Sequence, residues 1–120
     1  DDSYLIISTT LDSFYSVIDR VSILTSDKEK NIVTLETNGN TLILRSSSAE
    51  IGRVEEKMPI TKNNNEDIKI SFSAKYMMEA LKSFSTATVA IHFVGEIKPI
   101  LIKSTEDETL TQLVLPIRTY

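Results

Sequence analysis

The 120-residue chain contains no cysteine, one histidine and only three glycines. Without cysteine it can form neither a disulfide framework nor a thiolate metal site, and a reducing cytosol is a permissible environment. No apolar run approaches the length that spans a membrane. Gly39, Gly52 and Gly95 fall in predicted turns or strand breaks, so a glycine-rich phosphate-binding loop is excluded.

Titratable side chains that could converge on a substrate are also scarce. His92 alternates with Ile91 and Phe93 in a predicted strand, and we expect it to point to the less buried face. Glu55 and Glu56 are neighbours on a strand, so they point to opposite faces and cannot share a proton. The acidic stretch 106–108 matches no dedicated calcium loop. We therefore predict a non-enzymatic binding or structural module without metal or cofactor; a small hydrolase that uses His92 is the least supported alternative.

The amino-acid composition is that of an ordinary globular domain, with 41% apolar and 25% charged residues. The length fits one domain. The net charge of -4 argues against a domain that wraps nucleic acid on its own. The chain opens on neither a signal peptide nor an initiator methionine, so we expect it to be part of a longer protein.

Apolar residues at spacings of three and four predict two helices. The first begins at Leu11, is capped by the hydroxyl of Thr9 or Thr10, and ends near Leu24. The second follows a Ser73 cap. The predicted buried faces are Leu11, Phe14, Ile18 and Val21 on the first helix, and Met77, Ala80, Leu81 and Phe84 on the second.

Strands are predicted around these helices at 4–8, 31–37, 41–45, 50–58, 68–72, 88–93, 99–103 and 110–120. Asn38-Gly39 is the strongest hairpin signal, because both residues tolerate positive φ. The order strand–helix–three strands thus occurs twice, in halves of about 1–62 and 63–120. We predict an α+β fold in which both helices cover one face of a common, mainly antiparallel sheet.

The last stretch, 110–120, carries apolar residues on both faces of its predicted strand. Pro116 cannot donate a ladder hydrogen bond, so the strand should fray or lie at an edge there. One interpretation is a final core strand. The other is an exposed apolar ledge that a partner peptide occupies.

Three segments carry a resemblance to a known family: the ending TQLVLPIRTY at 111–120, the helix SAKYMMEALKSF at 73–84, and FYSVIDRVSIL at 14–24. Together they resemble the third, C-terminal domain of the bacterial DNA sliding clamp, the beta subunit of DNA polymerase III, over essentially the whole chain. The resemblance implies the DNA-clamp fold and a cytoplasmic, non-catalytic processivity factor of DNA replication. An unrelated α+β protein-interaction domain with no role on DNA is the alternative.

The resemblance also implies partners. The full-length protein would be a head-to-tail homodimer that encircles double-stranded DNA through weak contacts. It would recruit the replicative polymerase, clamp loader and repair proteins through short linear motifs, whereas this fragment alone would be monomeric. An acidic ring with a mildly basic lining reconciles the net charge with sliding on DNA.

Three sets of site residues follow from the resemblance. The partner-peptide groove would be formed by Tyr76, Ile97, Pro99, Leu113, Val114, Leu115, Pro116, Ile117 and Arg118. The ring interface would use Ile23, Leu24, Glu50, Glu55 and Glu56, and the DNA channel Arg20, Lys75 and Lys82. Without the resemblance, Tyr76 could equally be half-packed on its own sheet, Ile23-Leu24 could pack at the helix end, and the three cations could be solvated.

Overall fold

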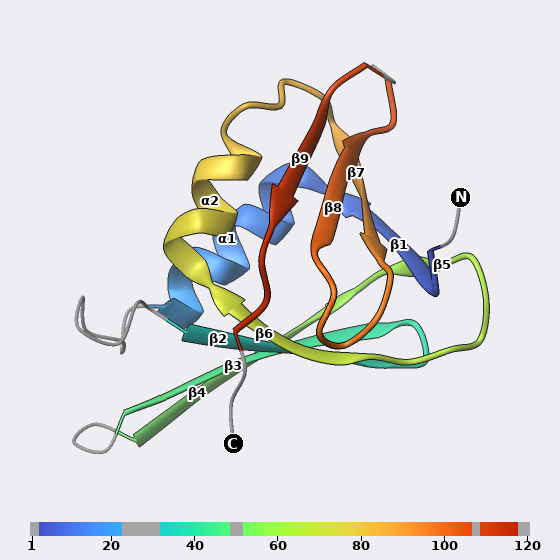
Figure 1. Ribbon diagram of the computed structural model, residues 1–120. Helices are drawn as coiled ribbons and strands as arrows, with labels where there is room; N and C mark the ends of the chain where they lie inside the picture. The colour runs from blue at the N-terminus through green and yellow to red at the C-terminus, as the bar shows by residue number, and fades with distance from the viewer. Residues whose placement is uncertain (1–2, 23–31, 49–51, 107–108, 118–120) are drawn as a thin grey trace.

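The computed structural model describes residues 3–22, 32–48, 52–106 and 109–117 (Figure 1). Both helices begin where the sequence predicts. The elements, in chain order, are β1 (Leu5–Thr10), α1 (Leu11–Val21), β2 (Ile32–Asn38), β3 (Thr41–Ser48), β4 (Gly52–Pro59), β5 (Thr61–Lys62), β6 (Lys69–Ser73), α2 (Ala74–Leu81), β7 (Thr88–Phe93), β8 (Ile100–Ser104) and β9 (Thr111–Val114).

The predicted order strand–helix–three strands occurs twice, with the short β5 between the two units. The α+β class and the antiparallel pairing are confirmed, but the strands form two sheets rather than one common sheet. The five-stranded sheet has the order β5-β1-β7-β8-β9, and the four-stranded sheet has the order β4-β3-β2-β6. The reason is an exchange: β1 of the first unit pairs with β7 of the second, and β6 of the second pairs with β2 of the first.

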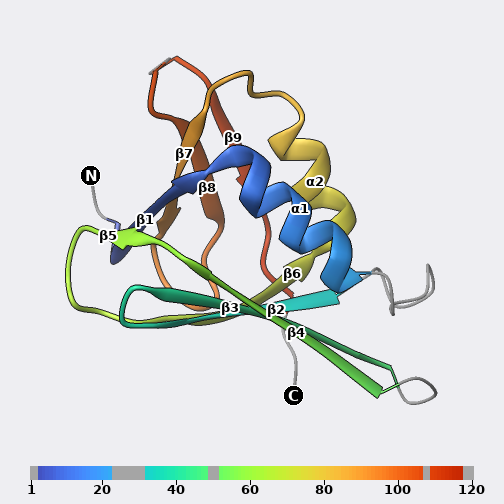
Figure 2. The ribbon, with the colours of Figure 1, turned by 180° about the vertical axis from the view of Figure 1, so that it is seen from behind.

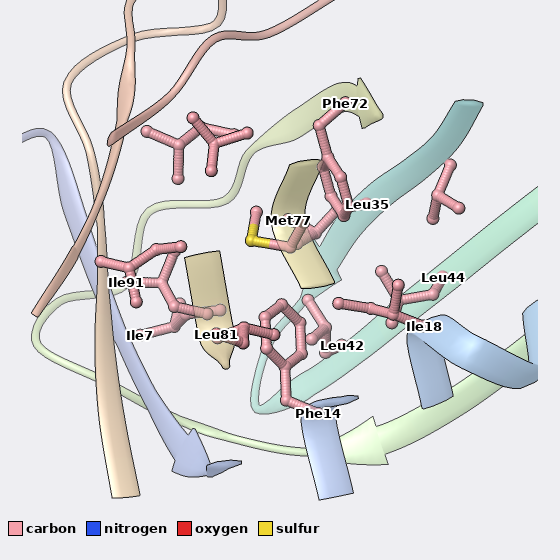
Figure 3. Close-up of a cluster of buried hydrophobic side chains, with 14 of the residues drawn as sticks. Ile7, Phe14, Ile18, Leu35, Leu42, Leu44, Phe72, Met77, Leu81 and Ile91 are labelled. Atoms are coloured by element: carbon pink, nitrogen blue, oxygen red, sulfur yellow. The ribbon is translucent and has the colours of Figure 1, made fainter. Parts of the chain in front are cut away.

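The two helices lie side by side and pack against both sheets (Figures 1 and 2). α1 contacts β1, β3 and β4, and α2 contacts β6 and β9. Figure 3 shows Phe14 of α1 and Leu81 of α2 between Ile7 and Ile91 of the five-stranded sheet and Leu42 of the four-stranded sheet. All five of these side chains are fully buried, so one hydrophobic core serves both sheets.

The two helix starts differ in their caps. The Ser73 hydroxyl accepts a hydrogen bond from the Tyr76 N–H at 3.3 Å, as predicted for α2. The Thr10 hydroxyl makes no such bond, so the predicted hydroxyl cap of α1 is wrong although the start at Leu11 is right. The Leu11 N–H is instead satisfied by the carbonyl of Ala87 at 2.9 Å.

The hairpin between β2 and β3 is confirmed. Asn38 pairs with Thr41 across the turn, and Gly39 has φ of 61°. A side chain with a Cβ is strained in this left-handed region, which is why glycine suits the position.

The C-terminal stretch departs from the predicted continuous strand. β9 ends at Val114 on the edge of the five-stranded sheet. The chain then crosses to the four-stranded sheet, where Pro116 forms a bridge with Phe72 and the Ile117 N–H donates to the Ser71 carbonyl at 2.8 Å. Pro116 has no N–H for a ladder, which fits the break after Val114.

His92 is buried, which corrects the expectation that it lies at the surface. β7 is a central strand, and His92 lies between Ile6 of β1 and Leu101 of β8. Its Nδ1 is 3.0 Å from the Ser3 hydroxyl oxygen. Burial, and secondarily the positive charge of Lys103, lower the pKa of His92.

The caps generate a paired prediction. Ser73→Ala should lower the free energy of unfolding by about 1 kcal/mol, because it leaves the Tyr76 N–H without its acceptor. Thr10→Ala is the matched control and should cost clearly less, since the Thr10 hydroxyl forms no cap bond. Urea unfolding of both variants measures the difference; equal losses would contradict this account of the caps.

His92 generates a pH prediction. Its pKa is lower in the folded chain than its ordinary value of about 6.5, so the unfolded chain binds the proton more readily. The contribution of neutral His92 to the free energy of unfolding is therefore complete above a pH of about 6.5, and it is lost as the pH falls below that value. Unfolding free energies measured from neutral pH downwards should decline less steeply in His92→Gln than in the unaltered chain; identical slopes would refute this.

Candidate functional site

The tail segment 115–117 separates two surface hollows. One, the α2 hollow of about 530 Å³, lies between α2, β9 and the tail. The other, the β6 hollow of about 560 Å³, lies between β6, the turn at Glu96-Ile97 and the tail. Leu115, Pro116 and Ile117 line both hollows, so the tail forms a ridge with a depression on either side.

Exposed apolar side chains gather at this ridge. Tyr76 is 57% exposed, Ile97 61%, Leu113 55% and Leu115 65%. These are four of the six large hydrophobic side chains that are exposed in the described part of the chain, and all four line one of the two hollows. Leu113 and Leu115 thus form an exposed apolar ledge, while Val114 between them is buried. Such a concentration is typical of a binding surface.

The structure brings together most of the residues predicted for the groove. Those in the α2 hollow are Tyr76, Leu113, Val114, Leu115, Pro116 and Ile117. Ile97 lies across the ridge in the β6 hollow. Pro99 is half-buried and lines neither hollow. Arg118 lies outside the described residues.

Several polar lining residues were not predicted. Glu79 and Ser83 share the α2 hollow with Tyr76, and their spacing of three and seven residues from Tyr76 could have identified them. In the β6 hollow, Lys69 comes from β6 and Glu96 from the turn between β7 and β8. Because these segments are distant in the chain, no local sequence pattern predicts that the two residues share a hollow. The two hollows are therefore apolar at the ridge and charged at parts of their walls.

Two hydrogen bonds fix the elements that form the walls of the α2 and β6 hollows. The Ser73 cap fixes the first turn of α2, from which Tyr76 projects, and the bond from Ile117 to Ser71 holds the end of the ridge. No three His, Asp or Glu side chains within the described residues could together hold a metal ion. The hollows can therefore bind apolar and hydrogen-bonding groups, and we assign no bond-making chemistry to them.

The predicted interface acids are engaged in ion pairs. Glu56 accepts two hydrogen bonds from the Arg20 guanidinium, at 2.8 and 2.9 Å, which lower the pKa of Glu56. Glu55 accepts from Arg45 at 2.6 Å, and Arg45 also bonds Glu36. The two glutamates point to opposite sides of β4, as predicted. Ile23, Leu24 and Glu50 lie outside the described residues.

The predicted channel cations fall into two kinds. The charge of Arg20 on α1 is offset by Glu56, a pairing that the sequence did not suggest because the two are far apart in the chain. Lys75 and Lys82 lie at the two ends of α2, exposed, and neither forms an ion pair among the described residues. Among the described residues, neither helix has the length and apolar composition of a membrane-spanning segment.

Comparison with known proteins gives consistent matches. The beta sliding clamps of Staphylococcus epidermidis and Staphylococcus aureus are each 42% identical over 107 residues, which cover 89% of this chain and 28% of theirs. The crystal structure of the DNA polymerase sliding clamp from Bacillus subtilis matches with a TM-score of 0.93 at 38% identity, over 100% of this chain and 32% of that one. The chain therefore spans less than a third of the length of these relatives.

The family described as "DNA polymerase III beta subunit, C-terminal domain" matches residues 1–118. That range includes both helices, both sheets and the ridge with its two hollows. By this match and by its identity to the staphylococcal clamps, the chain belongs to the C-terminal domain family of the DNA polymerase III beta subunit, the bacterial sliding clamp.

Proposed function

We propose that the chain acts as the third domain of a three-domain clamp subunit that tethers DNA polymerase to its template. Family membership and the share of the relatives that the chain covers support this assignment. The role is structural: the subunit closes head-to-tail with a second copy into a ring around double-stranded DNA. The chain contributes binding surfaces to that ring and no catalytic group.

The ridge and its hollows are the docking site for client proteins in this proposal. The observation that carries it is the clustering of Tyr76, Ile97, Leu113 and Leu115, all more than half exposed, around one ridge. Short segments of the polymerase, the clamp loader and repair proteins would place apolar side chains on both sides of Leu115. Pro99 and Arg118 belong to the same proposed site, Arg118 as a donor to the peptide.

The ring interface lies at β4 in this proposal. β4 is an edge of the four-stranded sheet and carries Glu55 and Glu56. Their ion pairs with Arg45 and Arg20 hold both carboxylates ionised, so a partner surface would meet an ordered row of charges. Ile23, Leu24 and Glu50 would complete the interface. In this proposal the complementary surface belongs to the first domain of the other subunit, so this domain on its own is expected to be a monomer.

The channel contacts would come mainly from Lys75 and Lys82. Both are exposed on α2, whereas Arg20 has its charge offset by Glu56. Few available cations give weak, salt-sensitive attraction to phosphates, which suits a ring that slides.

The docking proposal predicts the outcome of a peptide titration. A short peptide that contains glutamine and leucine should shift the amide NMR signals of Tyr76, Ile97, 113–115 and Ile117. Leu115→Ser should weaken this binding by about tenfold, because Leu115 lines both hollows. It should leave the unfolding free energy nearly unchanged, since the side chain is 65% exposed.

Val94→Ser is the matched control. Val94 is an exposed apolar residue that lines neither hollow, so its loss should not change the affinity. Equal weakening by both variants would mean that the peptide binds exposed apolar surface without selection. Shifts elsewhere, or unchanged binding in Leu115→Ser, would remove the docking assignment and favour an interaction domain of another kind.

A further inference from the structure

The four-stranded sheet ends in an uncovered edge at β4. All eight residues of β4 pair with β3, and no strand of the described chain pairs with its other side. Both helices lie on one face of this sheet, as Figure 2 shows. An edge strand has backbone N–H and C=O groups to which another strand can bond. The kind of partner that fits this edge therefore depends on the side chains of β4.

The side chains of β4 alternate between the two faces of the sheet. Met58 is buried towards the helices, and Glu56 points the same way, because it bonds a side chain of α1. Arg53, Glu55 and Lys57 occupy the alternate positions and are exposed on the opposite face. That face thus carries a cation, an anion and a cation along its outermost strand, and the two cations are about 13 Å apart along the backbone.

Both glutamates of β4 are already engaged within the domain. The Arg20 guanidinium donates to both carboxylate oxygens of Glu56, at 2.8 and 2.9 Å. On the opposite face, Arg45 of β3 donates to Glu55 at 2.6 Å and also bonds Glu36 of β2. The hydrogen bond from Arg45 is the main cause that lowers the pKa of Glu55. A partner would therefore meet two carboxylates that already have cations beside them.

The two cations of β4 are not engaged in this way. Arg53 and Lys57 are exposed, and neither forms an ion pair among the residues that the structure describes. Across the ladder, Arg53 lies opposite Ser47 and Lys57 lies opposite Ile43, so β3 offers a carboxylate to neither. Their nearest acidic neighbour along the strand is Glu55, which Arg45 holds. The charges on this face that remain available to a partner are therefore positive.

We propose that β4 is extended by an edge strand from a second copy of the full-length subunit, and that this strand places carboxylates opposite Arg53 and Lys57. Directly opposed side chains of an antiparallel pair lie about 5 Å apart, within reach of ion pairs from these long side chains to Asp or Glu. The inference rests on the proposed ring interface at β4. It adds the chemistry of the partner strand, which is two acidic residues four positions apart on the face away from the helices.

The other open edge of this domain does not meet that requirement. β9 is the outer strand of the five-stranded sheet, and its four residues are Thr-Gln-Leu-Val, with no acidic side chain. A second copy of this domain alone therefore lacks, at β9, the carboxylates that β4 requires. The partner strand belongs in this proposal to another domain of the second subunit.

A strand fits this edge better than nucleic acid does. Glu55 lies between the two cations and its pKa is lowered, so its negative charge would repel a continuous row of phosphates. Arg53 and Lys57 also lie on the sheet face away from the helices, whereas the cations proposed to meet DNA, Lys75 and Lys82, lie at the two ends of α2. Two separate carboxylates match the two positive positions without placing charge on Glu55.

The test uses the full-length clamp subunit and measures the dissociation constant of its dimer by fluorescence on dilution. Arg53→Glu and Lys57→Glu should each weaken the dimer about fivefold, because each replaces an ion pair by two like charges. Lys98→Glu is the matched control: it makes the same change of charge at an exposed lysine outside β4 and should leave the dimer unchanged. All three variants should keep nearly the same melting temperature, since the three side chains are exposed.

Glu55→Gln separates this proposal from an acidic edge that meets cations of the partner. It should not weaken the dimer, because Glu55 is bonded to Arg45 and makes no ion pair across the proposed interface. A dimer that is weakened by Glu55→Gln but not by Arg53→Glu or Lys57→Glu would overturn the proposal. So would equal weakening by Lys98→Glu, or a loss of DNA affinity in the two β4 variants with an unchanged dimer.

These outcomes are distinct from a failure of the ring itself. A dimer of ordinary strength that ignores both β4 variants would remove only the charge pattern proposed for the partner strand. A full-length subunit that stays monomeric at every concentration would remove the ring interface and this inference together.

Discussion

The backbone hydrogen bonds that join β1 to β7 and β6 to β2 are the constraint on which the rest of this domain depends. Each of these first strands belongs to one unit and lies in the sheet of the other, so neither sheet is complete without both units. Because α1 and α2 start where β1 and β6 end, the exchange also sets both helices against the two sheets and closes a single core.

The ridge is a consequence of the same arrangement. After its fourth strand, β4 or β9, each unit leaves the sheet of that strand through a Pro-Ile pair and returns beside its first strand, at β5 in one unit and at Ile117 in the other. The two crossings produce two similar hollows, the α2 hollow and a third one beside α1. Exposed Tyr76 and Leu115 line the hollow beside α2, and Ser13 and buried Met58 stand at the corresponding places beside α1, so a few side chains on a repeated frame distinguish the two surfaces.

Local patterns in the sequence predicted the helices and most of the strands, but they did not predict which distant segments pair with one another. Apolar spacing located both helices, and Asn38-Gly39 located the hairpin, because these signals involve neighbouring residues. The division into two sheets, the pair of Arg20 with Glu56 and the burial of His92 all depend on segments distant in the chain. The proposed groove residues came from the resemblance. The coordinates add the exposure of Tyr76, Ile97, Leu113 and Leu115 and their arrangement about one ridge.

One further consequence concerns aggregation. An unpaired strand edge can recruit a foreign strand, yet the outer edge of β1 is closed beyond β5 by side-chain amides: the Ile6 N–H donates to Asn63 Oδ1, and Asn64 Nδ2 donates to the Tyr4 carbonyl. The edge of β6 is covered at Phe72 by the tail. Among the described strands this leaves two edges, the four-residue β9 and the eight-residue β4. On β4, the longer one, alternating Arg53, Glu55 and Lys57 discourage pairing with an unselected neighbour.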